Sequence, residues 1–124
     1  MKFSWKETVS AFSEIYEFDI KEQVSKQKNK LLLNSSSNPI AREYFSRSKY
    51  INEIIRDSGI QIDKLDPIIR NIIRTFVSTV LLGEDIPLAV SRAIRISEKF
   101  SSPKSYKFIH ATISKIMSNL NKNS

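Results

Sequence analysis

Apolar residues recur along the chain at spacings of three and four, which is the period of an amphipathic α-helix. The sequence has only two glycines, and no stretch alternates apolar and polar residues as a strand does. The pattern therefore predicts an all-α protein. The expected helices are Phe3 to Phe18, a short one within Asp19 to Lys30, Ile40 to Asp57, Pro67 to Leu82, Pro87 to Phe100, and Tyr106 to Leu120. About six helices are expected to form one domain over residues 1–124.

The same spacing predicts which side chains of each helix face the core. The helix that opens at Pro67 has the most apolar residues, so it is expected to lie at the centre and to pack on more than one side. In the other helices the expected core positions are Trp5, Val9, Phe12 and Tyr16; Tyr44, Ile51, Ile54 and Ile55; Val90, Ala93, Ile94 and Ser97; and Tyr106, Ile109, Ile113, Met117 and Leu120.

Several helix ends carry capping residues. Asp66 followed by Pro67 is typical of an N-cap with proline in the first turn, and Ser102 with Pro103 repeats that signal. Gly59 and Gly83 are expected to end the helices that precede them. These signals mark where helices are expected to begin and end.

Net charge is the next informative property. The formal charge is +7, and its distribution is uneven: residues 1–66 hold 11 basic and 10 acidic residues, whereas residues 67–124 hold 9 and 3. Such an excess favours an anionic partner, although a composition biased by an A/T-rich genome would produce the same charge. The sequence has no cysteine and no apolar run of membrane-spanning length, so we expect a cytoplasmic protein without membrane contact.

Two basic surfaces are predicted in the second half. Arg92, Arg95 and Lys99 share the helix face opposite the expected core positions. In the last helix, a step of about 100° per residue places Phe108 roughly 200° from Tyr106, on the face that also carries Lys104, Ala111 and Lys115. An exposed aromatic ring among lysines suits single-stranded RNA, because bases stack on the ring and ammonium groups neutralise phosphates. Packing of Phe108 against a neighbouring helix is the alternative.

The sequence offers no set of residues that would form a catalytic or metal-binding site. His110 is the only histidine and has no second ligand at helical spacing; we expect it to pack at the edge of the core. The carboxylate pairs Glu14 with Glu17 and Glu84 with Asp85 are interpreted as solvated charge. No nucleophile, base and orienting group occur together, so the sequence predicts a protein that is not an enzyme and that uses no cofactor or metal.

Six short motifs follow one another in an order and spacing that resemble one family. They are Ile15-Tyr16, Leu65-Asp66-Pro67, Ile73-Arg74, Asp85-Ile86-Pro87, Glu98-Lys99-Phe100 and Lys107-Phe108-Ile109. The chain resembles the NusB-like RNA-binding family over nearly its whole length, strongly after Leu65 and loosely before. This resemblance implies a compact helical bundle of about six to seven helices.

The resemblance also implies a function and partners. NusB-like proteins bind single-stranded boxA-type RNA of ribosomal RNA leaders together with the small-subunit ribosomal protein called NusE, and they act in transcription antitermination. By residue, the resemblance carries RNA contacts over to Lys2 and Lys6 in the basic segment before and within the first helix, and to Lys107 and Phe108 where the last helix opens. The full set of expected RNA-binding residues is Lys2, Lys6, Arg92, Arg95, Lys99, Lys104, Lys107, Phe108 and Lys115. The oligomeric state is left open.

The chain departs from the family pattern at several positions. Only Lys2 and Lys6 stand where family members have several arginines, and Glu7 offsets them. Ile69 replaces a glutamate that would complete a capping box with Asp66. The remaining departures are Thr79 for glutamate, Ser91-Arg92 for Asn-Glu, His110 for asparagine, and an apparent two-residue gap after Pro87. The lost acidic residues are expected to alter an interface with the protein partner.

Two other functions remain open. A NusB-like domain that has lost boxA recognition would serve as a protein-interaction module, which the reduced arginine segment favours. A domain similar to the RNA-binding extension of ribosomal RNA cytosine methyltransferases would be the RNA-binding part of an rRNA-modifying complex, and it would co-purify with a catalytic partner chain.

Overall fold

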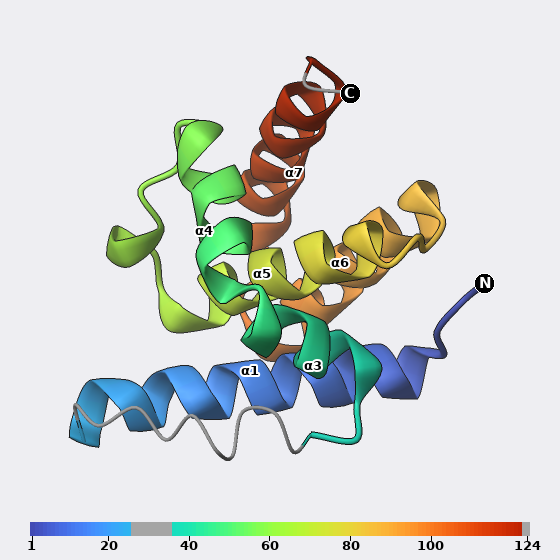
Figure 1. Ribbon diagram of the computed structural model, residues 1–124. Helices are drawn as coiled ribbons and strands as arrows, with labels where there is room; N and C mark the ends of the chain where they lie inside the picture. Colours follow the sequence, from blue (N-terminus) through green and yellow to red (C-terminus); the bar gives the residue numbers. More distant parts are fainter. Residues whose placement is uncertain (26–35, 123–124) are drawn as a thin grey trace.

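The chain forms a bundle of helices in a computed structural model that describes residues 1–25 and 36–122 (Figure 1). Among those residues there is no strand, which confirms the all-α prediction. The elements are α1 (Trp5–Ser25), α3 (Pro39–Ser46), α4 (Ser48–Asp57), a 3₁₀ turn η1 (Ile62–Lys64), α5 (Pro67–Leu81), α6 (Ile86–Phe100) and α7 (Ser105–Lys122). The stretch expected to form a short second helix is part of α1 up to Ser25, and its remainder lies outside the described residues.

Helix α5 is the centre of the bundle, as predicted. It packs against α1, α3, α4, α6 and α7. Its start follows the predicted cap, because the Asp66 carboxylate accepts a hydrogen bond from the Ile68 amide at 2.8 Å and Pro67 occupies the first turn. Its end is followed by Gly83, whose φ of +92° lies in the left-handed region that glycine adopts without strain.

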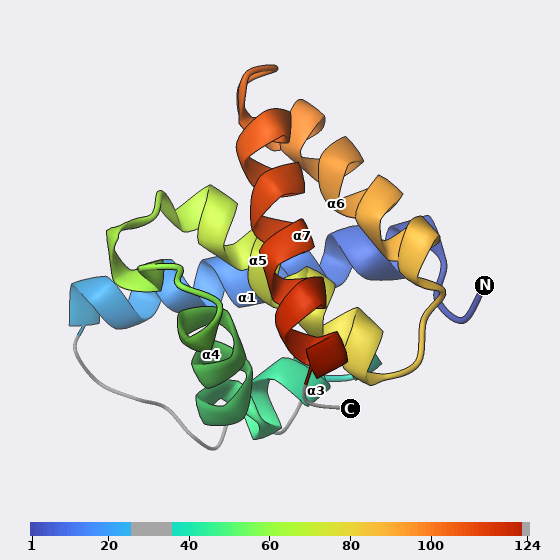
Figure 2. The same cartoon turned by 90° about the horizontal axis from the view of Figure 1, so that it is seen from above.

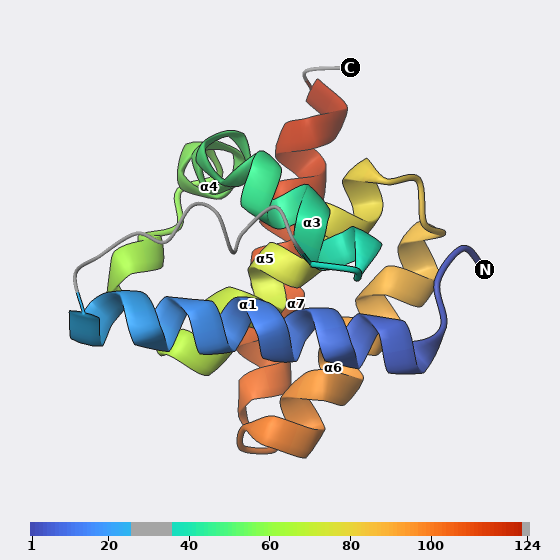
Figure 3. The ribbon, with the colours of Figure 1, turned by 60° about the horizontal axis from the view of Figure 1, so that its bottom comes forward.

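Helix α1 lies across one side of the bundle, over α5 and α6 (Figure 3). It begins with a reciprocal capping box: the Glu7 amide donates to the Ser4 hydroxyl at 3.0 Å, and the Ser4 amide donates to the Glu7 carboxylate at 3.0 Å. Of the predicted core positions Phe12 is buried, whereas Trp5, Val9 and Tyr16 are half-buried. The most buried apolar residues are instead Ala11 and Ile15. The core face is therefore rotated from the predicted one.

One predicted helix is two helices. The stretch from Ile40 to Asp57 is interrupted at Arg47, where α3 ends and α4 begins. The Ser46 hydroxyl donates to the Arg42 carbonyl at 2.8 Å, which is a local bond that competes with regular helix geometry. Tyr44, Ile51, Ile54 and Ile55 are nevertheless all buried, as predicted. The periodicity identified the core face but not the break.

Helices α6 and α7 form a hairpin, joined by a short turn (Figure 2). In α6, Ala93 and Ser97 are buried as predicted, and Val90 and Ile94 are half-buried against the core. In α7, Ile109 and Ile113 are buried, while Met117 and Leu120 are half-buried. Tyr106, expected inside, is 43% exposed. The buried face of α7 is centred on Ile109, Thr112, Ile113 and Ile116, and Tyr106 lies beyond its edge.

A buried ionic cluster ties α1 to α5. The Asp19 carboxylate accepts hydrogen bonds from Arg70 at 2.6 and 3.0 Å and from the Asn71 amide at 2.8 Å, and Arg74 lies 3.4 Å from it. Arg74 also donates to Asn52 of α4 at 3.0 Å. Burial raises the pKa of Asp19, but the bonds from Arg70 and Asn71 and the charge of Arg74 outweigh burial and hold that pKa below its ordinary value. The carboxylate is therefore charged inside the protein.

Candidate nucleic-acid interface

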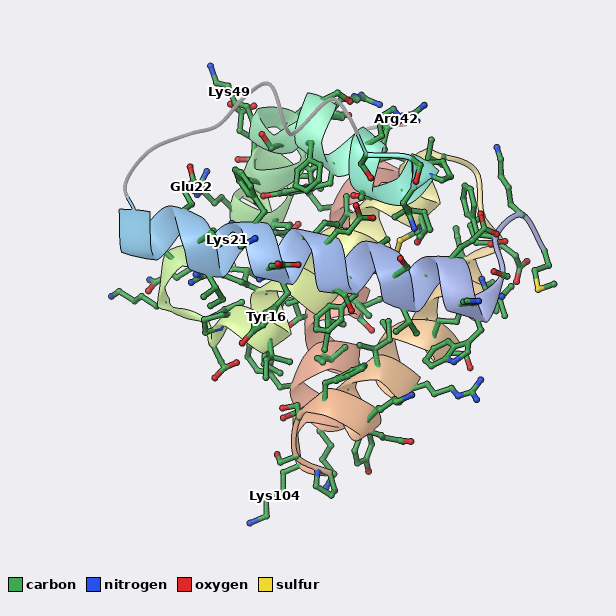
Figure 4. The ribbon with its side chains drawn as sticks, turned by 90° about the horizontal axis from the view of Figure 1, so that it is seen from below. Tyr16, Lys21, Glu22, Arg42, Lys49 and Lys104 are labelled. Atoms are coloured by element: carbon green, nitrogen blue, oxygen red, sulfur yellow. The ribbon has the colours of Figure 1, made fainter. Side chains whose placement is uncertain are left out.

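The opening of α7 presents an aromatic ring among basic side chains. Phe108 is 47% exposed, and Lys104, Lys107 and Lys115 are exposed as well. This confirms the predicted outward position of Phe108 and excludes its burial against a neighbouring helix. Lys104 stands at the outer end of the α6–α7 turn, on the side of α1 toward which Tyr16 points, whereas Lys49 and Arg42 lie on the opposite side (Figure 4). The α7 opening is thus a projecting corner of the molecule.

His110 differs from the prediction. It is exposed, not packed at the edge of the core. It lies one helical turn after Tyr106, so both side chains fall outside the buried face that Ile109 and Ile113 occupy. The exposed part of α7 is consequently wider than the spacing of its apolar residues suggested.

The predicted basic face of α6 is only partly at the surface. Arg95 and Lys99 are exposed, but Arg92 is only 6% exposed. Its guanidinium donates to the Phe3 carbonyl at 2.6 Å and lies 3.4 Å from both the Glu84 carboxylate and the Thr8 hydroxyl. The prediction that Arg92 belongs to an outer basic face with RNA contacts is wrong, because its charge is directed into the protein.

Glu84 explains why Arg92 is buried. Its carboxylate accepts hydrogen bonds from the backbone amides of Lys2 at 2.9 Å, Phe3 at 2.8 Å and Asp85 at 3.0 Å, and only 4% of the residue is exposed. Burial raises the pKa of Glu84, but these amides and the charge of Arg92 outweigh burial and lower that pKa from its ordinary value. Glu84 is therefore not the solvated turn residue that the sequence indicated.

We call this arrangement the N-terminal clamp, consisting of Lys2, Phe3, Glu84 and Arg92. It fixes the segment before α1 against the α5–α6 turn. The Lys2 ammonium also donates to the Leu82 carbonyl at the end of α5. Lys2 is thus bound through both its backbone and its side chain, whereas Lys6 is exposed on the first turn of α1.

Thr79 and Arg92, two departures from the family pattern, lie inside the protein. Thr79 is 3% exposed, and its hydroxyl donates to the Phe76 carbonyl at 2.7 Å. Arg92 belongs to the N-terminal clamp. Thr8, Thr79, Glu84 and Arg92 line one small internal cavity of about 10 Å³. A change of charge at Thr79 or Arg92 therefore alters internal pairing, and the expected effect on an interface with a partner has no support at these two positions.

A second surface, which the sequence did not predict, runs between α1 and α6. The Arg95 guanidinium carbon lies 4.2 Å from the centre of the Trp5 ring, and the Lys99 ammonium lies 5.7 Å from the centre of the Phe100 ring. Phe100 is 5.4 Å from Phe12 between ring centres. We call this surface the α1–α6 seam, defined by Trp5, Phe12, Tyr16, Arg95, Lys99 and Phe100.

The seam ends in an apolar groove of about 540 Å³ beside the start of α5. Phe12, Tyr16 and Phe100 line it together with Ile20 and Ile68. The spacing of Trp5, Phe12 and Tyr16 along α1 correctly predicted that these rings share one helix face. We had expected that face to lie in the core. Because the pairing rings come from different helices, only the fold brings them together with Arg95 and Lys99.

Not all the basic side chains in the formal charge count lie at the surface. Arg70, Arg74 and Arg92 are buried and pair with Asp19 or Glu84. In the second half of the chain, the exposed cations among the described residues are Arg95, Lys99, Lys104, Lys107 and Lys115. The positive surface of this half is therefore concentrated on α6 and α7.

The described ranges, 1–25 and 36–122, also bear on metal and membrane sites. They contain no group of three or more histidine, cysteine, aspartate or glutamate side chains arranged to hold a metal ion. None of the helices there has the length and apolar character needed to cross a membrane.

Comparison with known proteins gives the family. The family model described as "NusB family" matches residues 6–118. The chain belongs to the NusB family. It is also 25% identical over 112 residues to the transcription antitermination protein NusB of Desulfitobacterium hafniense, in both strain DSM 10664 / DCB-2 and strain Y51. In each case the alignment covers 84% of this chain and 76% of the relative. The resemblance drawn from the short motifs is thereby confirmed, and the chain is a divergent NusB family member.

Proposed function

We propose that this protein is an RNA-binding factor of the transcription antitermination type, which binds boxA-like single-stranded RNA of ribosomal RNA leader transcripts together with the small-subunit ribosomal protein NusE. Family membership and the name of the Desulfitobacterium relatives support this proposal. The single observation that carries it is the 47% exposure of Phe108 between Lys104, Lys107 and Lys115. At this exposure the Phe108 ring presents a face on which a base can stack, and the lysines beside it suit the adjoining phosphates.

Single-stranded RNA matches the chemistry of this corner. A base stacked on an aromatic side chain contributes about 1–3 kcal/mol, and any base can stack because each has a π-face. The lysines around the ring would neutralise phosphates on either side of the stacked base. Phe108 then provides the stacking contact, and Lys104 and Lys107 hold the backbone.

The proposed RNA-contacting residues follow from exposure. Arg92 is omitted because the clamp occupies it, and Lys2 is omitted because its ammonium is bound to the Leu82 carbonyl. The proposed set is Lys6, Arg95, Lys99, Lys104, Lys107, Phe108 and Lys115.

The test is a titration of the intact protein into labelled boxA-like RNA and into a scrambled RNA, with and without the ribosomal protein. Phe108→Ala is compared with Tyr50→Ala, since Tyr50 is 45% exposed on α4. We expect selective binding that Phe108→Ala weakens roughly tenfold or more, as the loss of one stacked base implies. Equal, weak binding of both RNAs, unaffected by Phe108→Ala, would rule out the proposal.

A second candidate function is a protein-interaction module without boxA recognition. The observation that favours it is the apolar groove of about 540 Å³ at the end of the α1–α6 seam. Under this alternative the ribosomal protein would bind in the absence of RNA, and Phe100→Ala would weaken that binding. Retention of RNA with no capture of the ribosomal protein would count against it.

A further inference from the structure

We propose that Arg95, whose guanidinium lies over the Trp5 ring, is a phosphate-binding contact for the RNA, separate from the base-stacking contact at Phe108. The inference rests on the proposed function, because it assigns a second point of contact to the same ligand. Its role is to hold the RNA backbone where α6 passes the first turn of α1. Arg95 would touch the RNA, and Trp5 would act as a positioning residue through Arg95.

The geometry of the pair leaves a phosphate-binding edge open. The Arg95 guanidinium carbon is 4.2 Å from the centre of the Trp5 ring, which is within the range of a cation–π contact. A cation–π contact is not a hydrogen bond, so it leaves the N–H donors of the guanidinium free, and these match phosphate oxygens in a bidentate arrangement. Arg95 is exposed and forms no ion pair with any described residue, including Glu98 three residues later. Its donors are therefore available to an anion.

Trp5 is a rigid platform for this arginine. The preceding residue, Ser4, caps α1 through its reciprocal bonds with Glu7. Phe3 is held by its amide to Glu84 and by its carbonyl to Arg92. Arg92 lies one helical turn before Arg95 on α6. Helix α6 therefore contacts the start of α1 twice, through buried Arg92 at Phe3 and through exposed Arg95 at Trp5. Such support reduces the entropy that the Arg95 side chain loses on binding.

Lys99 forms a second contact between a cation and an aromatic ring on α6. Lys99, one turn after Arg95, lies 5.7 Å from the centre of the Phe100 ring. Phe100 in turn contacts Phe12. Two exposed cations on neighbouring turns of one helix suit a ligand that carries several phosphates in a row. Single-stranded RNA is such a ligand, whereas an isolated anion is not. We therefore assign this part of the seam to the RNA backbone.

The experiment measures RNA affinity against salt concentration for the intact protein and for Arg95→Ala, Arg95→Lys and Lys49→Ala, with boxA-like RNA as the probe. Lys49→Ala removes one exposed positive charge from α4, on the side of α1 opposite to Lys104 (Figure 4). Loss of one phosphate contact on a single strand lowers the slope of log affinity against log salt by about 0.7. We expect that change for Arg95→Ala, together with roughly fivefold weaker binding. Arg95→Lys keeps the positive charge but loses the planar guanidinium. Its RNA affinity should therefore lie between that of the intact protein and that of Arg95→Ala.

The chain offers an independent readout, because Trp5 is its single tryptophan. RNA bound at Arg95 should change Trp5 fluorescence at saturation, and Arg95→Ala should reduce that change. Phe108→Ala provides the comparison: it should weaken binding while the fluorescence change persists at saturating RNA. Thermal unfolding of each variant verifies that an exposed substitution leaves the fold intact.

The outcomes separate this inference from the proposed function. If Phe108→Ala weakens binding while Arg95→Ala behaves like Lys49→Ala, the phosphate contact is overturned and the proposed function stands. Unchanged Trp5 fluorescence at saturating RNA would overturn it in the same way. If the intact protein binds no RNA, both the inference and the proposed function fail.

Discussion

The Arg92 guanidinium lies 3.4 Å from the Glu84 carboxylate in the interior of the protein, where neither side chain is more than 7% exposed. Arg92 belongs to α6 and Glu84 to the α5–α6 turn, and between them they hold the amide and the carbonyl of Phe3. This pair therefore anchors the segment before α1. Because this segment is bound to the α5–α6 turn, we expect RNA contacts from the helices that follow.

The first prediction concerns this pair. Glu84→Gln removes the charge opposite Arg92 and should lower the free energy of unfolding by about 2–4 kcal/mol, since it leaves a buried cation without its partner. Glu98→Gln, on the exposed face of α6, should change it by less than about 0.5 kcal/mol. Urea unfolding measures both. A double variant with Arg92→Met should lose less than the two single losses added together; strict additivity would show that the pair is not coupled.

Asp19 leads to the second prediction. Asp19→Ala leaves Arg70 and Arg74 buried without a counter-charge and should cost about 3–5 kcal/mol of stability. The matched control is Glu17→Ala on the same helix, whose exposed ion pair with Lys21 contributes at most about 1 kcal/mol. Chemical denaturation compares the two. Equal losses would mean that the buried cluster adds nothing beyond an ordinary surface pair.

The third prediction is the pH dependence of stability. The folded-state pKa values of Asp19 and Glu84 are both lowered, from ordinary values of 3.8 and 4.5. Each carboxylate therefore contributes its stability above its ordinary pKa, and that contribution is lost as the pH falls through the folded pKa. Stability should decline below about pH 4.5, and less steeply in Asp19→Asn and Glu84→Gln. Thermal melts from pH 6 downward test this; identical slopes in all three proteins would contradict it.

The fourth prediction concerns the turn after α5. Gly83 has a φ of +92°, and a side chain there would meet only the Lys2 ammonium at 3.5 Å, an ordinary contact. Gly83→Ala should therefore destabilise through the backbone alone, by about 1–2 kcal/mol. Gly83→Asn should cost less, because asparagine tolerates the left-handed region better. Gly59→Ala is the matched control, since Gly59 has a φ of +86° and open space around it. A much larger loss at Gly83 than at Gly59 would mean that contacts, and not φ, decide the cost.

The sequence predicted the parts of the fold that depend on local periodicity. The all-α class, the central position of α5 and its Asp66 cap follow from spacing and capping residues, because those signals act within one or two helical turns. The break at Arg47 was missed, since the apolar residues on both sides of it keep the same helical period. The extension of α1 beyond Phe18 was missed because polar Asp19 is buried through arginines about 50 residues away.

The candidate interface was predictable only in part. Phe108 could be placed outside because its own helix carries the evidence, namely the angle between Phe108 and the apolar positions. Arg92 could not, because its partners Phe3 and Glu84 come from other parts of the chain. Trp5 and Arg95 pair across two helices in the same way. Sequence periodicity assigns side chains to helix faces, and only packing decides which faces meet.

The dependence of RNA affinity on salt concentration is the decisive measurement for RNA binding by this protein. The proposed phosphate contacts are Lys6, Arg95, Lys99, Lys104, Lys107 and Lys115, beside the stacking contact at Phe108. Six neutralised phosphates on a single strand predict a slope of log affinity against log salt of about −4, at about 0.7 per phosphate. Titration of the intact protein into boxA-like RNA between low and moderate salt gives that slope. We expect affinity to fall steeply as the salt concentration rises; an affinity independent of salt would rule out phosphate contacts at these cations.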